Sequence, residues 1–159
     1  MLAESFREVR SISHDLMPNA LIKHGLAAAV RGLLGKLSSS NGGLRAEVQL
    51  FGLEERLPPL VASVLFRTIQ ELTQNIIKHA QASTMTLQIV CRADELTVMV
   101  EDNGVGFDPA TLRPDAGIGL HNAETRLAYL GGQAYFDTAL GRGTVITLTV
   151  PLTPAQPVG

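Results

Sequence analysis

The sequence predicts an α/β fold, a two-layer sandwich in which a mixed, mostly antiparallel sheet packs against helices. Three observations support this prediction. One long segment carries apolar residues at helical spacing along one side. Two pairs of alternating runs are separated by connectors of hairpin length. With 159 residues, of which 45% are hydrophobic, the chain is long enough for one well-filled core and too short for two.

Breaker residues set the bounds of the expected elements. Pro18 ends the first helix, because proline disfavours helix in the residue before it, and the serine- and glycine-rich segment 38–43 ends the second. The proline pair 58–59 introduces the longest helix, and Gly131-Gly132 closes the last one. The expected order is helix 2–17, helix 19–37, strand 46–51, helix 59–80, strands 84–92 and 96–101, helix 117–130, and strands 133–138 and 144–150.

The charge pattern excludes several classes of protein. The formal net charge is −2, no block of lysine or arginine occurs, and no aromatic platform accompanies the basic residues, so we expect no direct nucleic-acid binding. The apolar runs are too short to span a bilayer and the first residues lack a signal core, so we expect a cytoplasmic domain. The single cysteine, Cys91, is expected to be a small buried apolar residue.

The longest helix carries polar residues along one flank of its apolar stripe. Glu71, Asn75 and Lys78 line up there at a hundred degrees per residue. Magnesium prefers hard oxygen donors, so the Asn75 amide oxygen and triphosphate oxygens form a suitable shell. Glu71 can hold a metal-bound water or orient Asn75, and Lys78 supplies a point charge for a phosphate. The alternative is a flank that carries these residues for solubility alone.

Asp102 follows an apolar strand, where a carboxylate is costly without a partner. The exocyclic amine of adenine is one such partner. Gly104 and Gly106 are expected to let the backbone turn tightly while the flat base passes without a Cβ clash. Thr144, which follows Gly143, is expected to give a second adenine contact through a water. An ordinary turn would explain Asn-Gly at 103–104 but not Asp102 and Gly106.

A glycine-rich segment opens the last helix. Gly117, Gly119 and Leu120 lie where unpaired backbone N–H groups and the positive end of the helix dipole favour phosphate. The triphosphate is expected there, with segment 108–116 as a lid. Arg126, inside this helix, is expected to pair with Asn122 or to be a surface charge rather than a phosphate ligand.

The motifs occur in the order Glu71-x-x-x-Asn75, Asp102-x-Gly104-x-Gly106, Gly117-x-Gly119-Leu120 and Gly141-x-Gly143-Thr144. This order resembles the N, G1, G2 and G3 boxes of the GHKL ATPases, which implies a Bergerat-type fold that binds ATP and Mg²⁺. In histidine kinases of this superfamily the position of His79 often contacts the nucleotide. On the helical wheel, however, His79 falls on the apolar side, so a packed imidazole remains the alternative.

Four segments are similar in sequence to sensor histidine kinases of the nitrate- and lipid-fluidity-sensor subfamily: 9–18, 71–80, 119–122 and 131–132. The resemblance covers residues 5 to 151. It implies residues 1–18 as the end of the second dimerisation helix and the junction, 19–152 as the catalytic domain and 153–159 as a disordered tail. It further implies transfer of the ATP γ-phosphoryl group to a histidine of a dimerisation helix and relay of that group to a response regulator. The full-length protein is then expected to be a homodimer, and a membrane anchor outside this sequence is compatible with the resemblance.

The first dimerisation helix, which carries the phosphoacceptor in that family, has no counterpart in this sequence. His14 could replace the missing acceptor, because Asp15 beside it could serve as its base. However, Pro18 follows too closely for the long helix that an acceptor needs. Two alternatives to a histidine kinase remain open. One is a degenerate GHKL module that binds nucleotide as a regulatory signal, which the intact Asn75 and Asp102 disfavour. The other is an anti-sigma-factor serine kinase, which usually lacks the junction at 10–18.

Overall fold

The structure, a computed structural model, describes residues 19–40, 44–53, 57–106 and 118–152. The expected first helix with His14, the expected lid, Gly117 and the tail lie outside these ranges. Among the described residues, no helix combines the length and the apolar character that a membrane crossing requires.

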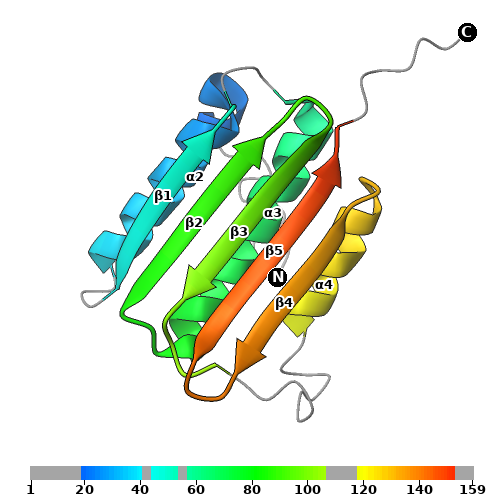
Figure 1. Ribbon diagram of the computed structural model, residues 1–159. Helices are drawn as coiled ribbons and strands as arrows, with labels where there is room; N and C mark the ends of the chain where they lie inside the picture. The colour runs from blue at the N-terminus through cyan, green and yellow to red at the C-terminus, as the bar shows by residue number, and fades with distance from the viewer. Residues whose placement is uncertain (1–18, 41–43, 54–56, 107–117, 153–159) are drawn as a thin grey trace, which may run out of the picture.

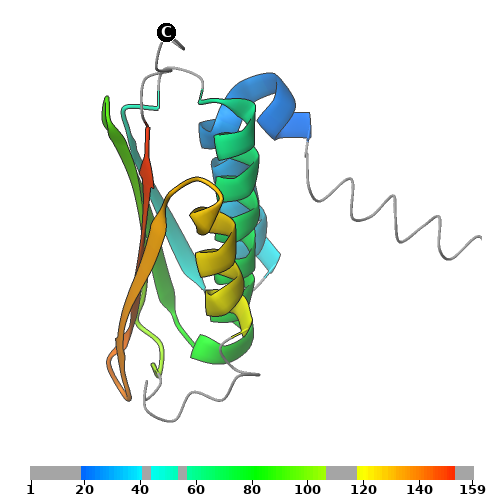
Figure 2. The ribbon, with the colours of Figure 1, turned by 90° about the vertical axis from the view of Figure 1, so that its right-hand side faces the viewer.

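In the part of the chain that the structure describes, five strands form one sheet, and three α-helices cover one of its faces. The sheet has the order β1-β2-β3-β5-β4 (Figure 1). Seen edge-on, the helices lie in a single layer and leave the other face of the sheet uncovered by helices (Figure 2). The elements are α2 (Asn19–Ser40), β1 (Arg45–Phe51), α3 (Pro59–Asn75), a π-helical turn η1 (Ile76–Ala80), β2 (Thr84–Cys91), β3 (Glu95–Asp102), α4 (Ile118–Ala128), β4 (Gln133–Ala139) and β5 (Gly143–Pro151).

Strand pairing confirms the mixed, mostly antiparallel sheet. β1 pairs with β2 in parallel, while β2–β3, β3–β5 and β4–β5 are antiparallel. Both expected hairpins are present, β2–β3 and β4–β5. Their registers place Asp102 of β3 opposite Thr144 of β5, and Thr144 opposite Thr138 of β4.

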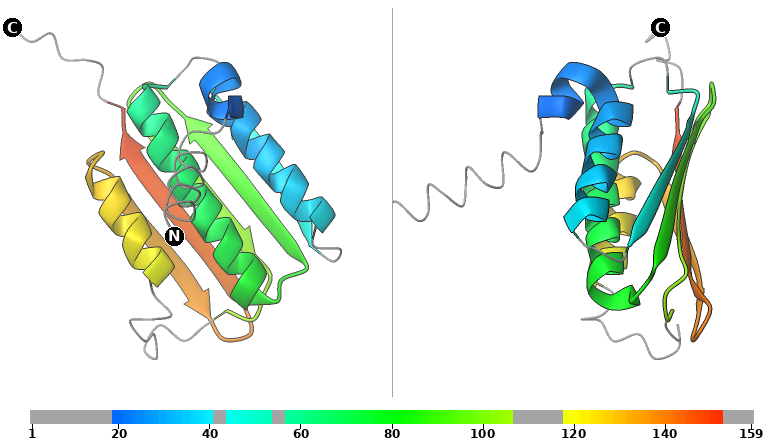
Figure 3. Two further views of the ribbon diagram at one scale, coloured as in Figure 1. Left: turned by 180° about the vertical axis from the view of Figure 1, so that it is seen from behind. Right: turned by 90° about the vertical axis from the view of Figure 1, so that its left-hand side faces the viewer.

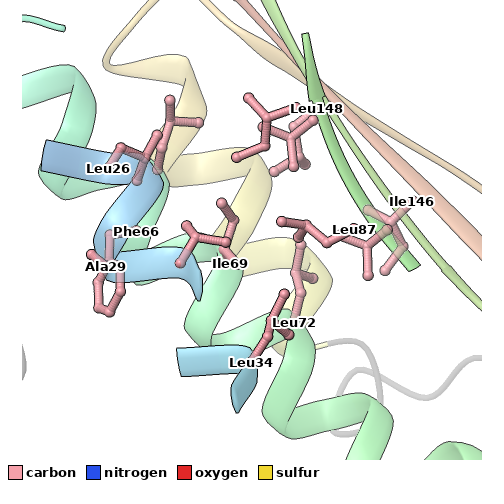
Figure 4. Close-up of a cluster of buried hydrophobic side chains, with 14 of the residues drawn as sticks. Leu26, Ala29, Leu34, Phe66, Ile69, Leu72, Leu87, Ile146 and Leu148 are labelled. Atoms are coloured by element: carbon pink, nitrogen blue, oxygen red, sulfur yellow. The ribbon is translucent and has the colours of Figure 1, made fainter. Parts of the chain in front are cut away.

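The core lies between the helix layer and the sheet. α3 occupies the centre of the helix layer, between α2 and α4 (Figure 3). Side chains of α2, α3 and the central strands meet there (Figure 4). The predicted apolar stripe of the longest helix is confirmed, because Leu65, Ile69, Leu72 and Ile76 are buried and Val61 is half-buried.

The longest helix differs from the prediction at its end. Regular α-helix stops at Asn75, and the chain continues through η1 to Gln81, which has the left-handed φ of 52°. A π turn changes the angular step between residues, so the hundred-degree rule that aligned Lys78 with Asn75 does not hold beyond Asn75. π turns of this kind recur at functional sites.

Two smaller expectations are also corrected. The second helix is interrupted at Gly25, whose φ of 88° is outside helical geometry. Cys91 is half-buried and packs against the edge of the core rather than inside it. Cys91 is the last residue of β2, next to the turn to β3, where side chains are covered from one side.

Candidate active site

The described parts of all four motifs meet at one end of the molecule. The C-terminal end of α3, the end of β3, the start of α4 and the start of β5 all lie at the lower edge of the sheet in Figure 1, and Figure 2 shows the same grouping. Two of these ends meet because β3 and β5 pair antiparallel, so β3 ends where β5 begins. Residues that are far apart in the sequence therefore lie at one edge of the sheet.

Asp102 is the last residue of β3, and only 5% of it is exposed. Its Oδ1 accepts the backbone N–H of Gly104 at 2.8 Å. Burial raises the pKa of this carboxyl, the backbone N–H groups of Gly104 and Thr144 lower it, and the charge of Glu101 raises it further. The net shift is upward. A carboxylate in this environment is a strong acceptor for a ligand N–H group.

Thr144 and Thr138 extend the row that Asp102 begins. Both threonines are buried, and their hydroxyl oxygens lie 2.8 Å apart. The registers place the three side chains on neighbouring strands β3, β5 and β4. Thr138 is a residue that the sequence analysis missed. Its position opposite Thr144 in the closing hairpin is the signal that would have found it.

Gly106 and Gly143 are required by contacts within the chain. Gly106 has φ 65°, and a Cβ there would overlap the carbonyl oxygen of Ala139. Gly143 has φ 84°, and a Cβ there would overlap the carbonyl oxygen of Asp102. The expectation that Gly106 makes room for a base is therefore corrected, because protein backbone occupies that space. The N–H of Gly141 donates to the carbonyl of Val105 at 2.6 Å and ties the same two loops together.

Asn103 closes the edge between β2 and β3. Its Oδ1 accepts the backbone N–H groups of Ser83 and Thr84, each at 2.9 Å, and its Nδ2 donates to the Ser83 hydroxyl at 2.8 Å. In the expected Asn-Gly turn, the asparagine therefore has a structural role. The Asn103 side chain holds the start of β2 beside Asp102.

Glu71 and Arg126 join α3 to α4. Nη2 of Arg126 donates to Oε1 of Glu71 at 2.6 Å, and Nη1 lies 2.5 Å from Oε2. The side chains are 25% and 27% exposed. The expectation that Arg126 pairs with Asn122 or is a surface charge is wrong, because packing of α4 against α3 brings Glu71 within reach. The Glu71 carboxylate is therefore paired with a cation.

The remaining expected residues lie at or beyond the end of α3. Asn75, its last residue, is half-buried, and Lys78 in η1 is exposed. His79 also belongs to η1, although the structure does not describe its side chain. Among the described residues, no group of three or more His, Cys, Asp or Glu side chains is arranged to hold a metal ion.

α4 begins at Ile118, so Gly119 and Leu120 fall in its first turn. The first turn of any α-helix has backbone N–H groups without partners inside the helix. This turn lies at the same edge of the sheet as the end of β3 (Figure 2), where Asp102 is the last residue. The start of α4 and the buried carboxyl of Asp102 therefore lie at one end of the fold.

Comparison with known proteins identifies the family. Residues 61–154, more than half of the chain, match the family model described as histidine kinase-, DNA gyrase B- and HSP90-like ATPase. The chain belongs to this family. The matched range includes Glu71, Asn75, Asp102 and Thr144, so the family model and the geometry agree on where the ATP-binding domain lies.

Relatives across the chain are histidine kinases. The chain is 35% identical over 156 residues to the signal transduction histidine-protein kinase/phosphatase DegS of Brevibacillus brevis, covering 98% of this chain and 40% of the relative. It is 30% identical to the oxygen sensor histidine kinase NreB of Staphylococcus carnosus, covering 92% and 42%. The chain thus spans about two-fifths of the length of these relatives. It is the ATP-binding catalytic domain of a sensor histidine kinase.

Solved structures confirm the fold. A blue-light-activated histidine kinase of Erythrobacter litoralis EL346 matches with a TM-score of 0.65 at 22% identity, covering 78% of this chain and 41% of that one. The mycobacterial sensor histidine kinase MprB matches with a TM-score of 0.62 at 18% identity, covering 79% and 93%.

Proposed function

We propose that this domain binds ATP with Mg²⁺ and supplies the γ-phosphoryl group to a histidine on a dimerisation helix of its full-length protein. The observation that carries the proposal is the buried Asp102 acceptor beside Thr144, at the same end of the fold as Asn75 and the start of α4. An acceptor for an amine and a helix start suited to phosphate match the two halves of a nucleotide.

The adenine half of the site is assigned to the sheet. Asp102 accepts from the exocyclic amine, and Thr144 makes the second contact, through a water or directly. Gly104 supports the acceptor by donating its N–H to Asp102. Gly106 and Gly143 act indirectly, because they let the two loops at this edge approach each other.

The phosphate half is assigned to α3, η1 and α4. Backbone N–H groups around Gly117, Gly119 and Leu120 receive phosphate oxygens, and Lys78 and His79 are the cationic and imidazole candidates beside them. Mg²⁺, held by the amide oxygen of Asn75, would neutralise charge on the phosphates. These residues position and stabilise, since phosphoryl transfer needs little covalent chemistry from the protein.

Glu71 is assigned a supporting role through Arg126. Its carboxylate already accepts a hydrogen bond from one guanidinium nitrogen and forms an ion pair with the other, so orientation of Asn75, one turn later on α3, fits it better than holding a water. The pair also fixes α4 against α3, and with it the position of the helix start that receives phosphate.

The partners follow from the relatives, which are sensor kinases. We propose a homodimeric full-length protein whose phosphohistidine passes its phosphoryl group to an aspartate of a response regulator. Direct contact with nucleic acid is not part of this proposal. His14 remains the alternative acceptor within this chain.

Calorimetric titration of ATP, with and without magnesium, tests the proposal. Asn75→Ala is expected to abolish the magnesium-dependent part of the affinity, whereas Gln74→Ala, a change at an exposed neighbouring position, is expected to leave it unchanged. Equal losses in both variants would contradict the metal assignment. Absence of ATP binding by the parent chain would contradict the proposed function.

A radiolabel transfer assay in the same sample tests the acceptor. Labelled ATP is expected to leave no label on this chain. Acid-labile label on the chain would instead make His14 the acceptor, and its loss in His14→Gln would establish that.

A further inference from the structure

The hydroxyl groups of Thr138 and Thr144 define a hydrogen-bonded chain at the adenine end. Their oxygens lie 2.8 Å apart, a distance at which either group can donate. Thr138 Oγ1 also lies 3.3 Å from the carbonyl oxygen of Gly143, which can only accept. Both threonines are buried, so each bond is shielded from competing water.

The number of protons decides the direction of donation. A threonine hydroxyl has one proton and two acceptor lone pairs. If Thr138 donated to Thr144, no proton would remain for the Gly143 carbonyl, and two acceptors would face each other. If Thr144 donates to Thr138, Thr138 can donate to the carbonyl, and both contacts are hydrogen bonds. Donation therefore runs from Thr144 through Thr138 to the carbonyl of Gly143.

This direction leaves Thr144 as an acceptor. Its proton points toward Thr138, and its lone pairs remain for a ligand. Asp102, its cross-strand partner on β3, is a second acceptor. Side chains directly opposite each other in an antiparallel pair have Cβ atoms about 5 Å apart, close enough for one small ligand group to face both.

We propose that Thr138 is a positioning residue that turns the Thr144 hydroxyl into an acceptor and thereby makes the site select adenine over guanine nucleotides. The exocyclic amine of adenine has two N–H donors for such an edge, whereas guanine places the acceptor O6 at the same position. Facing acceptors repel and stay unpaired, which rejects guanine. The inference rests on the proposed function, because it assumes that adenine lies at Asp102.

The test compares ATP and GTP affinities, each measured with magnesium by calorimetry, in variants of the 159-residue chain. Thr138→Val keeps the shape and removes the hydroxyl, so the Thr144 proton becomes free to turn toward O6 of guanine. We expect the ratio of ATP to GTP affinity to fall about tenfold, equivalent to about 1.4 kcal/mol. Part of this fall should appear as tighter GTP binding, which a loss of structure would not produce.

Two further variants serve as controls. Thr138→Ser restores the hydroxyl and is expected to restore the ratio. Thr147→Val removes a hydroxyl from β5 at a half-buried position, away from Asp102, Thr144 and Thr138. It is expected to leave the ratio of ATP to GTP affinity unchanged. Thermal unfolding is followed for every variant, and Thr138→Ala replaces Thr138→Val if the latter does not fold.

An unchanged ratio in a folded Thr138→Val or Thr138→Ala protein would overturn the inference. Equal weakening of ATP and GTP would also overturn it, because that result indicates a purely structural role. Failure of the parent chain to bind ATP would have a different meaning, since it would remove the proposed function and this inference with it.

Discussion

Two parts of the candidate site differ in what holds them in place. The adenine end, around Asp102 and Thr144, is set by strand register and by glycines whose neighbours leave no space for a side chain. The phosphate side, between α3 and α4, is joined by the side chains of Glu71 and Arg126. Backbone pairing admits almost no adjustment, whereas a side-chain pair between two helices can be broken and formed again.

This difference suggests a division of labour. Recognition of a flat base needs fixed acceptors, which a sheet edge supplies at low entropic cost. Binding and release of a triphosphate needs an element that can shift, and a helix held by an ion pair suits that need.

The largest effect is expected at Gly143. Gly143→Ala combines a left-handed backbone with overlap of the new Cβ and the Asp102 carbonyl, and should lower the free energy of unfolding by about 3 kcal/mol or more. Gly141→Ala is a matched control, since Gly141 has φ 79° but open space around its Cβ position, and should cost about 1–2 kcal/mol. Urea unfolding measures both, and equal costs would mean that backbone overlap does not determine the adenine end.

The Glu71–Arg126 pair should have an intermediate effect. A double-mutant cycle with Glu71→Gln and Arg126→Gln is expected to give a coupling energy of about 1–2 kcal/mol, between the values for exposed and buried pairs. The exposed pair Arg142–Asp137, with side chains 67% and 77% exposed, is the control and should give less than about 1 kcal/mol. A coupling no larger than that of the control would show that α4 is held by apolar packing alone.

The smallest effect is expected from the titration of Asp102. Because burial raises its pKa, the folded state binds more protons than the unfolded state between the ordinary and the raised pKa. The stability of the parent therefore falls as pH rises through the raised pKa. Asp102→Asn removes this titration, so its stability relative to the parent should rise from acid to neutral pH.

Thermal unfolding across that pH range measures this difference. Asp94→Asn, a change of an exposed carboxylate in the β2–β3 turn, is measured beside it as the control for loss of a charge. A difference between Asp102→Asn and the parent that stays constant with pH would mean that the Asp102 carboxyl is not desolvated.

Much of the site could be predicted because it depends on local signals. Asp102 at the end of a strand, Asn75 on a helix flank and the glycine motifs are each readable from neighbouring residues. The role of Arg126 could not be read in this way, since its partner lies on another helix. Thr138 could have been found only from its register opposite Thr144 in the β4–β5 hairpin. The role of Gly106 differs from the prediction because Gly106 lies in the loop after β3 and its neighbour, Ala139, is the last residue of β4.

Periodicity and breaker residues act within a few residues, so they were enough to predict the order of the described elements, the two hairpins, the apolar stripe of α3 and the position of Asp102. The row from Asp102 to Thr138, the Glu71–Arg126 pair and the π turn after Asn75 depend on tertiary packing. These features arise when distant segments pack together, and no local pattern in the chain records which side chains then meet.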